Sequence, residues 1–169
     1  MNKSVSLLLF AALASLTGCA GYHPGTTKPA KLAGIQKLAI PTFENKTLVP
    51  RLEVLTTNAV IKKIQATGAY QIVDREHADA VLVGEIWDIQ RSQFRAVTSN
   101  TLQTSEIMAR LRLNYYVIDK QGVKLIVGQR IGYSNIVLDP SYQITELQVL
   151  ANAAERLGNE MASEITEGW

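Results

Sequence analysis

Residues 107–118 read IMARLRLNYYVI, a stretch in which apolar and polar side chains alternate. A repeat of two places successive side chains on opposite faces of a strand, so the leucines and the arginines of this stretch are expected on opposite faces. The tetrapeptide DKQG at 119–122 predicts a turn, and residues 123–137 return as a second long strand. Two adjacent long strands joined by a short turn indicate an antiparallel hairpin.

Further strands and two helices are predicted around this hairpin. The sequence predicts strands at 34–43, 70–73 and 80–94, a polar turn at 44–47, and helices at 50–66 and 142–167. Pro41 is expected to end the first strand or to place it at an edge, and Gly68 to stop the first helix. The order β-α-β-β-β-β-α predicts an α+β two-layer sandwich, with two helices packed on one face of a mostly antiparallel four- or five-stranded sheet.

Side-chain patterns predict how these elements face one another. An apolar stripe of helical period runs along the second helix through Leu147, Leu150, Ala151, Ala154, Leu157, Met161 and Ile165. The sheet face away from the helices is expected to carry Arg110, Arg112, Glu85 and Arg130 among apolar residues, open to solvent or to a partner. Gly128 and Gly132 in the second hairpin strand are expected to mark bulges or close approaches.

The N-terminus has the features of a secretory signal. Lys3 precedes the short apolar segment VSLLLFAALASL, and the run LTGC at 16–19 resembles the bacterial lipobox. In signals of that kind, the cysteine thiol is acylated, with palmitate among its chains, and becomes the first mature residue. We expect residues 1–18 to be a signal peptide, 19–31 a tether lipidated at Cys19, and 32–169 a single α+β domain. The alternative is an ordinary signal peptide with a chance cysteine.

Composition narrows the class of protein. The chain has 169 residues, of which 47% are hydrophobic and 19% charged, typical of a globular domain. A net charge of +2 is too small to favour nucleic-acid binding. The two histidines, His23 and His77, lack the spacing of a metal site, and no catalytic or cofactor signature is present. We therefore predict no enzyme activity, no cofactor, no metal and no nucleic-acid partner.

Arginines on or near the long strands are the candidate binding residues. They are Arg91, Arg95, Arg110, Arg112 and Arg130. The planar guanidinium binds phosphate through two parallel hydrogen bonds, and apolar neighbours can lie along acyl chains. Lipopolysaccharide offers both groups, so some of these arginines are hypothesised to contact it. The alternative is a solvated sheet face with cross-strand ion pairs from arginine to Glu85 or Glu106.

A family resemblance rests on the order of several short motifs. These are LTGCAGYH at 16–23, IPTFENKT at 40–47, ADAVLVG at 78–84, the charged strand hairpin and the C-terminal helix. In this order they resemble the lipopolysaccharide-assembly lipoprotein (LptE) family across nearly the whole mature chain. The cysteine-glycine-tyrosine opening of that family is matched at 19–22 with one inserted residue, Ala20.

The resemblance implies a structural role. Members of the family are outer-membrane lipoproteins facing the periplasm, which plug and help to assemble the β-barrel LptD. That pair inserts lipopolysaccharide into the outer leaflet. Ala20 also differs from the aspartate that retains enterobacterial lipoproteins in the inner membrane, which favours the outer membrane. The expected partners are LptD, lipopolysaccharide and the membrane reached through the lipid anchor.

Two other classes share some of these features. Secretion-channel subunits of the curli type and activators of peptidoglycan synthases also pair an NKT-like turn with an ADAVLVG-like strand. A ring-forming subunit would assemble into a symmetric particle, whereas a barrel plug would be monomeric until its barrel is present. An enzyme of envelope remodelling is a further alternative, and no residue pattern supports it.

Overall fold

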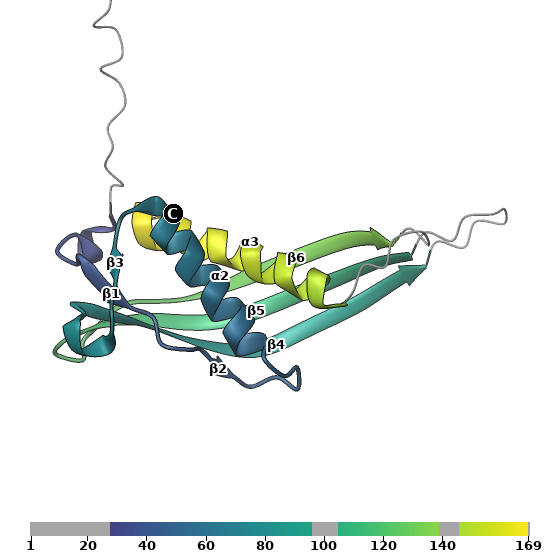
Figure 1. Ribbon diagram of the computed structural model, residues 1–169, viewed down its shortest axis with the longest axis horizontal. Helices are drawn as coiled ribbons and strands as arrows, with labels where there is room; N and C mark the ends of the chain where they lie inside the picture. The colour runs from purple at the N-terminus through teal and green to yellow at the C-terminus, as the bar shows by residue number, and fades with distance from the viewer. Residues whose placement is uncertain (1–27, 96–104, 139–145, 169) are drawn as a thin grey trace, which may run out of the picture.

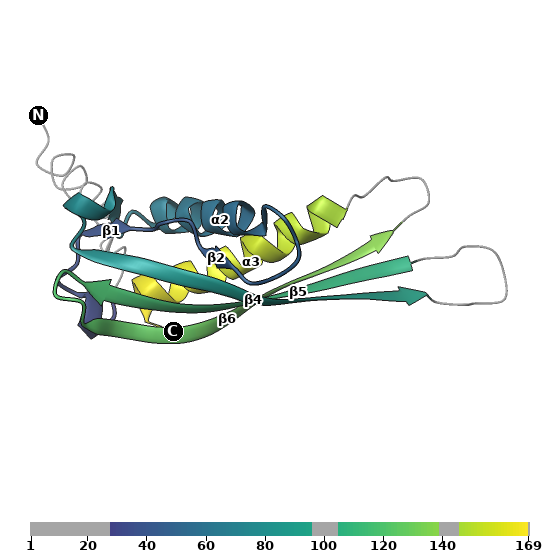
Figure 2. The ribbon, with the colours of Figure 1, turned by 90° about the horizontal axis from the view of Figure 1, so that it is seen from below.

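Two helices cover one face of a single six-stranded sheet, and no helix of the described residues covers the other face (Figures 1 and 2). The computed structural model describes residues 28–95, 105–138 and 146–168. The α+β sandwich with both helices on one side is therefore confirmed.

Three long strands form the body of the sheet. They are β4 (Ala80–Arg95), β5 (Ser105–Asp119) and β6 (Lys124–Leu138), which pair antiparallel in sequence order. They extend past the helices at one end of the molecule (Figure 2). The predicted hairpin is confirmed, with Asp119 Oδ1 accepting hydrogen bonds from the backbone N–H groups of Gln121 (2.9 Å) and Val123 (2.8 Å) in its turn.

Three short strands make the sheet mixed. They are β1 (Lys37–Ala39), β2 (Glu44–Asn45) and β3 (Gln71–Ile72). β1 lies between β3 and β4 and is parallel to both, and β2 is parallel to β4. The sheet therefore has more strands than the four or five predicted, and it is mixed, with parallel short strands beside the predicted antiparallel long ones. Helix α2 (Leu52–Thr67) lies between β1 and β3 in the chain, and a crossover through a helix makes the flanking strands parallel.

The segment after β1 departs from its prediction for a local reason. Residues 34–43 do not form one strand, because β1 ends before Pro41 and the chain rejoins β4 only at β2. The predicted polar turn at 44–47 therefore begins with a strand. Asn45 organises the residues after β2: its Oδ1 accepts from the Thr47 N–H (2.9 Å) and hydroxyl (2.7 Å), and its Nδ2 donates to Glu53 Oε2 (2.7 Å) on α2.

Both helices were predicted, with differences at their ends. Helix α2 stops at Gly68, whose φ of 67° is the left-handed conformation of a C-terminal cap, as predicted. Helix α3 (Glu146–Glu167) is described from Glu146, so the predicted start at 142 lies outside the described residues. Leu147 was wrongly placed in the apolar stripe, since its side chain is exposed, whereas Val149 and Ala153 are buried. The buried stripe is wide because α3 contacts α2 as well as β5 and β6.

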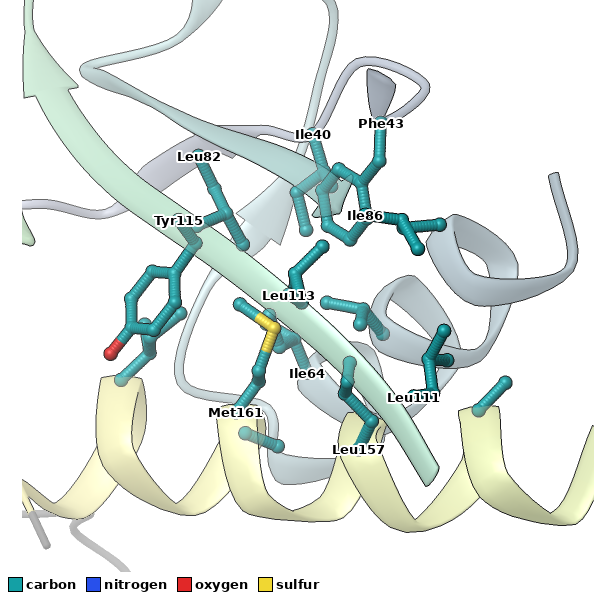
Figure 3. Packing of buried hydrophobic residues seen from close by; sticks show 14 of the residues in the cluster. Ile40, Phe43, Ile64, Leu82, Ile86, Leu111, Leu113, Tyr115, Leu157 and Met161 are labelled. Atoms are coloured by element: carbon teal, nitrogen blue, oxygen red, sulfur yellow. The ribbon is translucent and has the colours of Figure 1, made fainter. Parts of the chain in front are cut away.

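The core lies between the sheet and the two helices. Leu111, Leu113 and Tyr115 of β5 point from the sheet toward Leu157 and Met161 of α3 (Figure 3). The leucines of the opening stretch are thus buried on the face that their alternation predicted. The remaining labelled core residues in this view are Ile40, Phe43, Ile64, Leu82 and Ile86.

Two buried tyrosines form hydrogen bonds with the C-terminal half of α3. The Tyr70 hydroxyl donates to the Ile165 carbonyl oxygen (2.8 Å), and burial raises the pKa of Tyr70 to about 12. The Tyr115 hydroxyl donates to Glu164, whose carboxylate also pairs with Arg130 (2.6 Å). Burial, followed by the bond to Glu164, raises the pKa of Tyr115 well above its usual value. The folded chain therefore favours the neutral, protonated form of both tyrosine side chains.

These tyrosines predict a loss of stability in alkali. Between pH 10.0 and about 12 the unfolded chain loses the Tyr70 proton and the folded chain keeps it, so the free energy of unfolding falls as pH rises. The slope approaches about 1.4 kcal/mol per pH unit for each such tyrosine. Denaturant unfolding at pH 9, 10 and 11 measures the slope, and Tyr70→Phe is expected to make it shallower. Parallel curves for both chains would contradict this account.

Candidate functional site

The uncovered sheet face, called here the open face, is built from alternate residues of β4, β5 and β6 (Figure 2). The strand register sets neighbours side by side across it. The rows are given from the Arg95 end of the sheet toward the β5–β6 turn. They are Gln90–Arg110–Tyr133, Asp88–Arg112–Ile131, Glu85–Asn114–Gln129 and Val83–Tyr116–Val127. Arginine, amide and aromatic side chains thus share one surface on rigid strands.

Apolar side chains are unusually exposed on this face. Val127, Ile131 and Tyr133 of β6 are 68%, 40% and 52% exposed, and Trp87 of β4 adds a further ring at 37%. Aromatic residues and arginine together are typical of the anchoring positions of protein interfaces. The open face therefore has the composition of a contact surface rather than of an ordinary solvated sheet.

A β-bulge shapes the centre of the open face. The register shifts between Ile86 and Asp88, so that Trp87 and Asp88 together face Arg112. Arg112 Nη1 donates to Asp88 Oδ2 (2.9 Å), and its guanidinium carbon lies 5.3 Å from the centre of the Trp87 ring. Without the extra residue, Asp88 would point toward the helices. The bulge therefore holds a carboxylate and an indole on either side of one guanidinium.

Removing Arg112 tests this arrangement. Arg112→Ala is expected to lower the free energy of unfolding by about 1 kcal/mol, because the ion pair with Asp88 and the contact with Trp87 are only partly shielded from water. Arg110→Ala is the matched control, since Arg110 is exposed in the next row and forms no ion pair with a residue whose side chain is described. Equal losses in urea unfolding would contradict the role given to Arg112.

The five candidate arginines do not form one patch. Arg110 and Arg112 lie on the open face as predicted, but Arg130 was wrongly placed there. Its register partner is the buried Leu113, so it lies on the helix side, where its guanidinium pairs with Glu164 (2.6 Å). The prediction failed because faces were assigned to each strand separately, without the register between them.

The remaining two arginines lie near the C-terminal end of β4. Arg91 is exposed and is paired with Ala109, which belongs to the helix side. Arg95 is the last residue of β4, and its side chain lies outside the described set. The bulge before Asp88 changes which residues of β4 share a face, so alternation counted from Ala80 does not continue past Ile86.

One arginine of the open face pairs across the strands with a carboxylate that the sequence did not suggest. The sequence suggested Glu85 or Glu106 as the partner. Arg112 pairs with Asp88, whereas Glu85 lies opposite Asn114. Asp88 was missed because a bulge leaves no clear trace in the pattern of apolar residues. The tryptophan within a long strand was the available signal.

Other predicted positions lie away from this face. Cys19 and His23 are outside the described residues, and His77 is exposed in the short 3-10 helix η3 (Arg75–His77). Within the described ranges, no cluster of three His, Cys, Asp or Glu side chains is placed to hold a metal ion. The same ranges contain no helix with the length and apolar character needed to cross a membrane.

Two of the hollows on the described surface are formed between neighbouring elements. One, of about 280 Å³, lies between η3 and the β5–β6 turn and includes Asp79 and Lys120, which pair at 3.3 Å. Hydrogen bonds from the backbone N–H groups of Lys37 and Gln36 lower the pKa of Asp79, so this carboxylate serves the fold. The other, of about 410 Å³, lies between β6 and α3 and was not predicted from the sequence.

Several solved structures resemble this chain at low sequence identity. A neuraminyllactose-binding hemagglutinin homolog from Helicobacter pylori is 11% identical, with a TM-score of 0.51 over 88% of this chain and 89% of that chain. The PelC dodecamer from Paraburkholderia phytofirmans is 16% identical, with a TM-score of 0.46 over 83% and 96%. A minor lipoprotein from Acinetobacter baumannii is 14% identical, with a TM-score of 0.39 over 78% and 90%.

Sequence families give a more specific result. No curated protein matches the chain. The family model LptE, described as lipopolysaccharide-assembly, matches residues 35–168, which include every described strand and helix of the sandwich. This is a family of lipoproteins, not of enzymes. The chain therefore belongs to the lipopolysaccharide-assembly (LptE) family.

Proposed function

We propose that this chain is an outer-membrane lipoprotein that plugs and helps to assemble the β-barrel LptD, the translocon that inserts lipopolysaccharide into the outer leaflet. The family match over residues 35–168 is the observation that carries the proposal. Residues 1–18 are removed as a signal peptide, the lipid on Cys19 holds residues 19–31 at the periplasmic side of the membrane, and residues 32–169 form the plug. The plug acts through shape and charge, and it makes or breaks no bond.

The open face supports a partner of this kind. The interior of a water-filled barrel is polar and is lined by side chains that alternate with lipid-facing ones. The open face offers polar groups, such as Arg110 and the Gln129–Asn114 pair (3.0 Å), beside exposed apolar residues such as Ile131. A surface that mixes these groups on long strands suits a barrel wall, since neither an apolar core nor bulk water would satisfy all of them.

Recovery of the barrel from native membranes tests the assembly role. The tagged full chain, extracted in mild detergent, is expected to bring down a large β-barrel in equal amount. A large symmetric particle that contains only this chain would instead indicate a ring-forming subunit of the curli type. Either that particle or the absence of any barrel would overturn the proposal.

The contact with lipopolysaccharide is a separate part of the proposal. The candidates are Arg91, Arg95, Arg110, Arg112 and Arg130. Geometry favours Arg110 and Arg112, because they lie in neighbouring rows of the open face, beside exposed apolar side chains. Arg130 lies on the helix side of the sheet, where it pairs with Glu164, and so does not adjoin these two arginines. Phosphate binding by the planar guanidinium explains why arginine suits this role.

A double variant tests these two arginines. Arg110→Ala with Arg112→Ala is expected to weaken binding of lipopolysaccharide by about tenfold or more, since each charge-assisted contact contributes about 1.5–3 kcal/mol before compensation. Lys62→Ala with Arg75→Ala removes the same charge from exposed positions on α2 and η3, and it should leave affinity unchanged. Equal affinities for both double variants, measured by calorimetry with the full chain, would remove Arg110 and Arg112 from the site.

A further inference from the structure

The hollow between β6 and α3 is built on rigid elements. It has a volume of about 410 Å³ and is lined by Ser134 and Asn135 of β6 and by Asn152, Glu155, Arg156 and Asn159 of α3. Its base is fixed because the helix passes directly over the strand. A methyl group added at Gly132 would come within 2.1 Å of the Ala153 carbonyl oxygen. Side chains on such a base keep their spacing, as a binding site requires.

Side-chain amides are the distinctive chemistry of this hollow. Asn135, Asn152 and Asn159 are all exposed at its walls. In the described part of the chain, none of these amides forms a side-chain hydrogen bond, an ion pair or a ring contact. Each amide carries two N–H donors and one carbonyl acceptor, so together they present many unused groups of both kinds.

Packing does not explain the two asparagines of α3. Asparagine is a poorer helix former than alanine, because its side chain competes with the backbone for hydrogen bonds. Asn152 and Asn159 lie seven residues apart on one exposed side of the helix. Gly158, another poor helix former, has a structural reason, since a methyl group there would meet the Ala59 carbonyl oxygen at 2.9 Å. No packing contact of this kind accounts for Asn152 or Asn159, and both line the hollow.

Charged and aromatic groups complete the surroundings. The Arg156 guanidinium carbon lies over the Tyr133 ring of β6, 5.0 Å from its centre. Glu155 is held by an ion pair with Lys63 of α2 (2.9 Å). The hollow thus offers donors and acceptors within one small space, a half-exposed ring contacts one of its lining residues, Arg156, and its lining includes no large aliphatic side chain.

We propose that this asparagine-lined hollow binds a sugar residue. Neighbouring hydroxyl groups of a sugar both donate and accept hydrogen bonds, which amides, a guanidinium and a carboxylate can match in pairs. An aromatic ring such as Tyr133 packs against the C–H face of a sugar. Two envelope sources carry this chemistry: the core oligosaccharide of lipopolysaccharide and the glycan strand of peptidoglycan. The inference goes beyond the barrel role and does not depend on it.

Nuclear magnetic resonance can observe the binding groups directly. The ¹⁵N-labelled full chain in detergent micelles is titrated with lipid-free core oligosaccharide and, separately, with the disaccharide of N-acetylglucosamine and N-acetylmuramic acid. At least one sugar is expected to shift the side-chain NH₂ signals of Asn135, Asn152 and Asn159. A response to the core alone assigns the hollow to lipopolysaccharide, and a response to the disaccharide alone assigns it to peptidoglycan. No shift with either sugar at millimolar concentration would overturn the proposal.

Variants separate binding from stability. Asn152→Ala with Asn159→Ala is expected to weaken sugar binding about tenfold or more, while the thermal midpoint stays equal or rises because alanine favours the helix. Asn58→Ala on α2 is the matched control, since Asn58 is an exposed helical asparagine that is not among the residues lining the hollow. It should leave the affinity unchanged. A double variant that binds as tightly as the natural chain would also overturn the proposal.

Discussion

Replacing Gly132 with alanine is expected to destabilise the fold by about 3 kcal/mol, the upper end of the usual cost of overfilling a core. The added methyl group would lie 2.1 Å from the Ala153 carbonyl oxygen and 2.6 Å from Leu157 Cβ. Ala153 and Leu157 belong to the buried side of α3, so neither atom can turn away as a flexible side-chain end would. The helix must move off β6, and the core beneath it must open.

Gly34 provides the matched control for this prediction. A methyl group there meets no atom within 4 Å, and the backbone needs no left-handed conformation. Gly34→Ala should therefore change the free energy of unfolding by less than about 0.5 kcal/mol. Urea unfolding of both variants measures the difference. A stable Gly132→Ala chain, with the midpoint of the Gly34→Ala chain, would show that α3 does not lie against β6 as described.

Loss of the thiol at Cys19 is expected to abolish membrane attachment. Each buried methylene contributes about 0.8 kcal/mol to anchoring, so several acyl chains hold a protein almost permanently and their absence leaves little to replace them. Cys19 is the only cysteine of the chain, so no other residue can take the lipid. Cys19→Ala protein should therefore appear in the aqueous fraction after membranes are washed at high pH. Recovery of the barrel with it should fall in parallel.

Ser15→Ala, in the same leader, keeps the thiol and should stay with the membrane. The mass of the N-terminal peptide of the natural chain gives the direct measurement. It is expected to be that of a cysteine carrying acyl chains, preceded by no leader residue. A mature chain with a free thiol in the aqueous fraction would remove the anchor from the proposed function.

The candidate surface could be predicted only in part. Alternation along residues 107–118 was enough to place Arg110 and Arg112 on the face away from the helices, because the two sides of that strand differ clearly in polarity. Residues 123–137 mix glycine, apolar and charged residues on both sides, so the same reasoning failed for Arg130. The polar hollow was not predicted, because its walls come from β6 and α3 and share no local pattern.

By itself the sequence determined the long strands, the two helices, the stop at Gly68 and the close approach at Gly132, since period, capping and the absence of a side chain act over a few residues. The tertiary structure alone decided the direction of β1, β2 and β3 and the bulge that turns Asp88 toward Arg112. Strand direction and register depend on which segments meet across the sheet. The packing of the helices over the sheet sets which segments pair. A local repeat of side-chain types along the sequence does not indicate this pairing.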